Sequence, residues 1–192
     1  DGVKTDDPRR LTAAKYADYA LGKFFEQAKK EDYYKNTVFL VIADHDSRVR
    51  GIGAFPLTNY SIPALIISPD VTPRVDKRIV SQIDMLPTLL SLTGVSGEFP
   101  LSGEDLTRND IIERAPVSYN ELFGYVKDDK FTLLVPGTAP IFFKIGEHNT
   151  ITQSDKLSQK DLPVSVSVLN MGIQIYENNL QRISCVKGLK QN

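Results

Sequence analysis

The chain has 192 residues, a formal net charge of −1 and a pI near 6.2. Its Lys and Arg residues are scattered, with no run of five or more, so we expect no nucleic acid partner. The lone cysteine, Cys185, excludes an internal disulfide, and no stretch approaches the roughly 18 apolar residues of a membrane span. The length suits one domain with a buried core.

The N-terminal segment predicts a helix that begins inside a longer protein. The opening DGVKTDDPRR lacks an initiator Met and resembles the middle of a loop. Asp7 and Pro8 favour a helix start, since Asp caps free amides and Pro tolerates the first helical position. Behind them, small and apolar residues recur at three- and four-residue steps and predict an amphipathic helix that ends near Glu31: Ala13, Ala17, Ala20, Leu21, Phe24 and Ala28.

Two uncharged runs follow the helix and predict strands. Residues 37–43 contain Val, Phe and Ile without a charge, a pattern typical of a central strand of a parallel sheet with both faces covered. Residues 62–68 form a second such run, which stops at Pro69.

Residues 84–93 predict a helix, with Asp84 as its N-cap and Gly94 as its end. Asp84 could instead mark a second site, but capping is the simpler interpretation. Leucines at 86, 89 and 90 share one helical face, and we expect that face to be buried against the sheet.

The pattern changes in residues 111–192. Alternating segments with turn signals predict a small antiparallel sheet, with Asp128 and Asp129 at the tip of a hairpin, and residues from Pro163 onward predict a terminal helix. The expected fold class is α/β: a parallel sheet flanked by helices, with a small C-terminal antiparallel sheet and a terminal helix. We divide the chain into residues 1–110, the α/β core, and residues 111–192, the antiparallel subdomain.

Asp44 and His45 come directly after the first uncharged run. Ligands of open α/β sheets bind beyond the carboxyl ends of strands, and a carboxylate oxygen with an imidazole nitrogen suits a divalent cation such as zinc or manganese. In the alternative interpretation Asp44 caps a turn and His45 is a surface residue. His148, in a polar loop, and Cys185 are predicted to have no catalytic role.

Four segments resemble, in order, the C-terminal half of the sulfatase-like branch of the alkaline phosphatase superfamily: NTVFLVIADH, YSIPALIISPD, VSQIDMLPTLLSLTGV and PLSGEDL. The similarity is strongest to membrane phosphoglycerol transferases of the lipoteichoic acid synthase type. It covers residues 8–106 well, and the remainder is only loosely similar. The resemblance implies part of an alkaline phosphatase-like fold.

The resemblance also implies a site. Asp44 and His45 would ligate the catalytic divalent metal, which would be manganese, magnesium or zinc. The nucleophile, a Thr or Ser, is expected upstream of Asp1, so no catalytic residue is expected in this chain. The family usually has Gly after the Asp-His pair, where this chain has Asp46. Asp46 could orient His45, and Arg48 could face an anionic phosphate, or both could be solvated loop residues.

The implied function is a metal-dependent phosphoglycerol- or phosphoethanolamine-type transferase that acts on lipid- or glycan-linked phosphodiesters at the cell envelope. The parent would be anchored in a membrane by segments outside this chain, with this domain periplasmic or extracellular. The missing N-terminal half would be its partner, and this chain alone would be inactive. Two alternatives remain open: a sulfatase or phosphatase that releases the group to water, or a non-catalytic interaction module with a decayed site.

Overall fold

The computed structural model describes residues 8–45, 55–154, 162–178 and 180. These residues belong to two compact units. The first contains described residues up to Leu40 together with Ile66–Pro73, and the second contains Val41–Leu65 together with those from Arg74 onward. No helix in the described ranges is both long enough and apolar enough to cross a membrane.

The first unit is built around an aromatic cluster at the end of a long helix. Helix α1 spans Pro8–Ala28, which confirms the predicted N-terminal helix, and a short 3₁₀ helix, η1, follows at Asp32–Asn36. The rings of Phe24, Phe25 and Tyr34 surround Phe39, with centroid distances of 6.1, 5.4 and 5.4 Å. Phe39 is the first residue of the following strand, so this cluster joins the helix to the strand.

Strands β1, Phe39–Ile42, and β2, Ala64–Ile67, form a two-stranded sheet. The amide of Ala43, just after β1, donates to the carbonyl of Pro63, just before β2, at 3.2 Å. The end of one strand therefore lies beside the start of the other, which is an antiparallel arrangement. The predicted parallel sheet is not matched, because an uncharged run indicates burial but carries no information about strand direction.

The predicted helix near residue 84 is present, but its buried face differs from the prediction. The 3₁₀ turn η3, Gln82–Asp84, leads into α2, Met85–Leu92, and Gly94 follows with a φ of +72°. Met85 and Thr88 are the buried residues. Of the three leucines expected on the buried face, Leu89 and Leu90 are half-buried and Leu86 is 51% exposed. The amide of Leu106 donates to Thr88 Oγ1 at 3.0 Å. The loop that contains Leu106 therefore packs on the Thr88 face of α2, and this face is the buried one.

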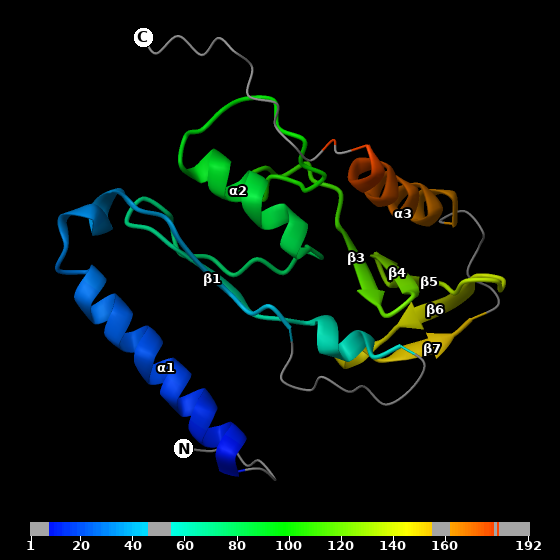
Figure 1. Cartoon of the computed structure of the whole chain (residues 1–192), viewed down its shortest axis with the longest axis horizontal. Coiled ribbons are helices and arrows are strands. Elements are labelled where there is room, and N and C mark those ends of the chain that lie inside the picture. The colour runs from blue at the N-terminus through cyan, green and yellow to red at the C-terminus, as the bar shows by residue number, and fades with distance from the viewer. Residues whose placement is uncertain (1–7, 46–54, 155–161, 179, 181–192) are drawn as a thin grey trace. The chain divides into compact units, whose positions relative to one another are not determined.

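The C-terminal part is a five-stranded antiparallel meander, as predicted for residues 111–192 (Figure 1). Its strands follow chain order: β3 Arg114–Tyr119, β4 Leu122–Lys127, β5 Lys130–Leu134, β6 Ile141–Ile145 and β7 Ile151–Gln153. Lys127 pairs with Lys130 across the β4–β5 turn, where Asp128 has a φ of +54°. The expected hairpin tip at Asp128 and Asp129 is therefore confirmed.

One face of this sheet carries the main core. Phe131 and Leu133 are fully buried and pack with Val126, with Phe55, and with Leu57, the first residue of the 3₁₀ helix η2, Leu57–Tyr60. On the other face Tyr125 and Thr132 are paired across β4 and β5 and are also buried. Helix α3, Leu162–Glu177, packs against β4 and confirms the predicted terminal helix.

Candidate functional site

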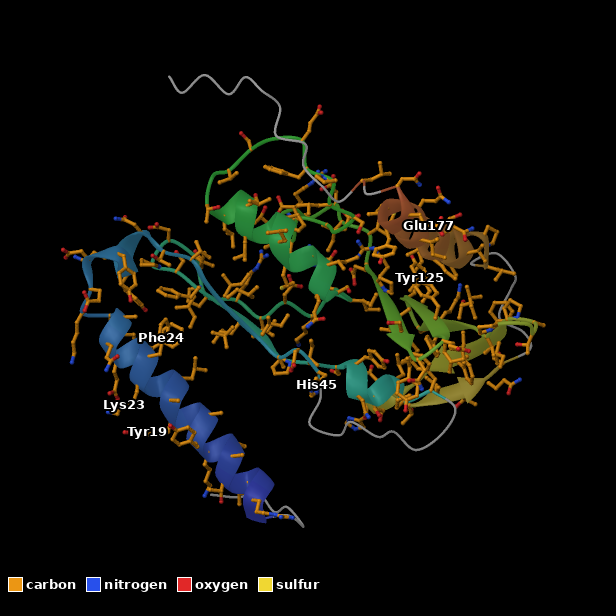
Figure 2. The ribbon with its side chains drawn as sticks, viewed as in Figure 1. Tyr19, Lys23, Phe24, His45, Tyr125 and Glu177 are labelled. Carbon is orange, nitrogen blue, oxygen red and sulfur yellow. The ribbon has the colours of Figure 1, made fainter. Side chains whose placement is uncertain are left out.

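Asp44 and His45 lie immediately beyond the end of β1 and are exposed to solvent. The side chains are 86% and 66% exposed, respectively. Asp44 Oδ1 accepts a hydrogen bond from the backbone amide of His45 at 2.9 Å, and Asp44 Oδ2 lies 3.4 Å from His45 Nε2. The two side chains therefore converge beside the strand end, where Figure 2 labels His45.

This spacing fits two ligands of one metal ion. Ligands held about 2.0–2.2 Å from a tetrahedral ion stand roughly 3.4 Å apart. The observed separation of Oδ2 and Nε2 is 3.4 Å, and the donors are one carboxylate oxygen and one imidazole nitrogen. The same separation also allows a direct contact between the two side chains. The pair can thus reach a common ion with little rearrangement.

Asp44 and His45 are two candidate ligands of this kind among the described residues. No group of three or more His, Cys, Asp or Glu side chains is gathered anywhere in the described part of the chain. A catalytic zinc site typically has three protein ligands plus a water. Asp46 and Arg48, the predicted orienting and phosphate-facing residues, lie outside the described ranges, as does Cys185.

A residue that sequence reasoning missed contacts the backbone of this pair. Gln82 Nε2 donates to the carbonyl oxygens of Ala43 at 3.0 Å and Asp44 at 3.4 Å. Gln82 lies in the SQID segment, in which Asp84 is the predicted polar residue of interest for its capping role. The contact of Gln82 joins residues 39 apart in the sequence. Hydrophobic periodicity gives no signal for such a long-range polar contact.

Asp84 has a structural role, though not the predicted one. Its side chain does not cap α2. Instead it accepts from the backbone amide of Ser81 at 2.7 Å, which forms a capping box at the start of η3. The carboxylate is 1% exposed and also accepts from the amide of Glu104 at 2.8 Å and from the guanidinium of Arg114 at 2.9 Å. This buried ion pair ties the entrance of α2 to the first residue of β3.

His148 lies in the 3₁₀ turn η4, Glu147–Asn149, with a φ of +56° and an exposed side chain. It belongs to no group of three metal-ligating side chains among the described residues.

Comparisons with known proteins agree with the resemblance. Residues 5–95 match the sulfatase family model. A crystal structure of a protein in the alkaline phosphatase superfamily from Vibrio parahaemolyticus aligns with a TM-score of 0.84 and 38% identity, over 96% of this chain and 46% of that chain. The crystal structure of Ps i-CgsB, at 17% identity and a TM-score of 0.56, shares the fold.

The curated relatives are also similar to this chain over part of their length, and they are lipoteichoic acid synthases. Lipoteichoic acid synthase 1 of Bacillus subtilis is 29% identical over 50% of this chain and 17% of its own length. Lipoteichoic acid synthase of Staphylococcus saprophyticus is 25% identical over 88% of this chain and 28% of its own length. The chain thus spans less than a third of these relatives. Together these matches support a sulfatase-like domain of the alkaline phosphatase superfamily in this chain, similar to that of the lipoteichoic acid synthases.

Proposed function

We propose that this chain is part of a metal-dependent phosphoglycerol- or phosphoethanolamine-type transferase that acts on phosphodiesters at the cell envelope. The observation that carries the proposal is the Asp44–His45 pair, which lies inside the sulfatase-matching region with its donor atoms 3.4 Å apart. The named lipoteichoic acid synthases favour transfer over hydrolysis.

The chain's own contribution is to hold two metal ligands at a strand end. When bound, a divalent ion such as manganese, magnesium or zinc would lower the pKa of an attacking hydroxyl and stabilise charge on the transferred group. Asp44 Oδ1 accepts a hydrogen bond from the His45 amide, which leaves Oδ2 beside His45 Nε2, and these two atoms would hold the ion. Both side chains are exposed, so the site stays accessible to a substrate.

The remaining parts of the site would come from residues that precede Asp1. The hydroxyl nucleophile and the further metal ligands are assigned to that N-terminal half, which also makes it the chain's main partner. The half-buried strands β1 and β2 support this assignment, since their uncharged residues are not fully covered among the described residues. Membrane anchoring, with this domain outside the cytoplasm, belongs to the same proposal.

A sulfatase or phosphatase is the second candidate, because the matching family model is described as sulfatase. It would use the same metal ligands and release the group to water. The products distinguish the two: a transferase attaches the group to an added glycerol or glycan acceptor, whereas a hydrolase yields free sulfate or phosphate. If the whole protein neither turns over these substrates nor binds a metal ion, a non-catalytic interaction role is supported instead.

The test compares the whole gene product with this chain. We expect the whole product to turn over a phosphodiester with manganese, and His45→Ala to lower that rate more than about 100-fold. His148→Ala is the matched control and should retain the rate.

The isolated chain should show no turnover of a chromogenic phosphodiester or sulfate ester. Calorimetry should show manganese binding weaker than about 1 μM. Turnover by the isolated chain that disappears in His45→Ala would contradict the assignment of the nucleophile to residues before Asp1.

A further inference from the structure

We propose that Gln82 is a positioning residue for the Asp44–His45 pair, a role that rests on the proposed function. The amide group of Gln82 holds the backbone from which both ligands project. It would act on the metal through the orientation of that backbone, without touching the metal or the substrate.

The geometry that supports this role is a shared hydrogen bond. Gln82 Nε2 lies 3.0 Å from the carbonyl oxygen of Ala43 and 3.4 Å from that of Asp44. These oxygens belong to the two peptide groups on either side of the Asp44 Cα. Holding both restricts rotation of Asp44 and of the peptide that leads into His45, so one side chain sets the direction of two ligands.

Gln82 is suited to this role because its own position is well determined. It follows Ser81, whose amide donates to Asp84 Oδ2 at 2.7 Å, and the buried Asp84 carboxylate is held in turn by Arg114 at 2.9 Å. There is no room for this turn to shift toward Gly103, where an added Cβ would stand 1.9 Å from the carbonyl oxygen of Ile83. The turn that carries Gln82 is therefore fixed by buried polar contacts on its neighbours, and a side chain on a fixed turn can position the backbone that it bonds.

The ligand pair needs such an anchor because packing does little to orient it. The Asp44 and His45 side chains are 86% and 66% exposed, so only a small part of either side chain is packed against other atoms. A metal site loses affinity when its ligands must be ordered at the moment of binding. A hydrogen bond from a distant, fixed residue supplies part of that order in advance.

The first experiment needs no metal. Gln82→Met keeps the length of the side chain and removes its N–H donors, and Gln27→Met on the exposed face of α1 is the matched control. We expect backbone ¹⁵N order parameters at Asp44 and His45 near 0.85 in the wild type and below about 0.6 in Gln82→Met. Order parameters unchanged by Gln82→Met would overturn the positioning role.

The second experiment measures manganese at the site in the whole chain. The chain has two histidines, so the imidazole proton signals of His45 and His148 can be followed separately as Mn²⁺ broadens them. In the wild type, His45 should broaden at a lower Mn²⁺ concentration than His148. In Gln82→Met the concentration that broadens His45 should rise about three- to tenfold, as expected for the loss of a supporting hydrogen bond.

The two failures can be told apart. If His45 broadens no earlier than His148 in the wild type, the proposed metal function is overturned, whatever Gln82 does to the backbone. If His45 broadens first but responds equally in the wild type, Gln82→Met and Gln27→Met, the metal site stands and the role of Gln82 is overturned.

Discussion

The two sheets of this chain differ in composition and in burial: β1 and β2 contain apolar residues alone, whereas β3–β7 mix apolar with polar residues, yet the mixed sheet is the more buried one. In the β3–β7 sheet, Phe131 and Leu133 are 0% and 1% exposed and pack with Phe55 and Leu57 of the same unit. In the β1–β2 sheet no residue is fully buried, and Leu65 is 57% exposed. An apolar strand is buried only when other elements cover it. Described residues cover one face of the five-stranded sheet closely, whereas they cover the two-stranded sheet only in part.

The sharpest way to test this difference is to truncate one large side chain in each sheet. Phe131→Ala should lower the free energy of unfolding by about 3–5 kcal/mol, because it leaves a cavity in a closed core. Leu65→Ala should change it by less than about 0.5 kcal/mol, as for other exposed positions. Urea denaturation followed by circular dichroism measures both. Equal losses would show that the β1–β2 sheet is as closed as the other.

A second test compares a buried and an exposed Arg–Asp pair. Arg114→Met leaves the 1% exposed Asp84 carboxylate without its cation, and we expect a loss of about 3–5 kcal/mol. Arg108→Met breaks the ion pair of Arg108 with Asp110. The two side chains are 61% and 72% exposed, so solvent screens the pair and the variant should lose far less stability than Arg114→Met. The same denaturation experiment applies. A small loss in Arg114→Met would show that water reaches Asp84.

Substitution of two glycines should give a smaller difference in stability. Gly103→Ala places a Cβ 1.9 Å from the carbonyl oxygen of Ile83, so the backbone must move, at a cost of about 1–3 kcal/mol. Gly22→Ala in α1 meets no atom within 4 Å and should stabilise the chain by about 0.5–1 kcal/mol. Thermal unfolding should shift in opposite directions for the two variants. A shift in the same direction would contradict the tight packing around Gly103.

The smallest expected effect is a pH dependence of stability at the ion pair of Asp76 and Arg78. The guanidinium of Arg78 donates to Asp76 and lowers the pKa of that carboxyl below its ordinary value, and burial opposes the shift. A lowered folded-state pKa gives stability that is present above the unfolded pKa, near 3.9, and is lost as pH falls through the folded pKa. Asp76→Asn should therefore cost at most about 1 kcal/mol at pH 6, and the difference from the wild type should shrink below about pH 4. A difference that stays constant with pH would rule out this ion pair.

Local chemistry determined much of the fold from sequence. The helices near residues 8, 84 and 162 and the antiparallel C-terminal strands were predictable, because capping residues, apolar periodicity and turn residues act over a few positions. The ordered motifs also identified the family, and with it Asp44 and His45 as candidate ligands, whose metal role stays a prediction.

Tertiary structure decided the features that depend on contacts distant in sequence. The antiparallel direction of β1 and β2 depends on which strand ends meet, and the buried face of α2 depends on a loop whose Leu106 amide bonds Thr88. The contact of Gln82 with Ala43 spans 39 residues. Apolar patterning indicates which side chains favour burial. Contacts between distant segments decide which of those side chains are buried, and only the folded chain brings these segments together.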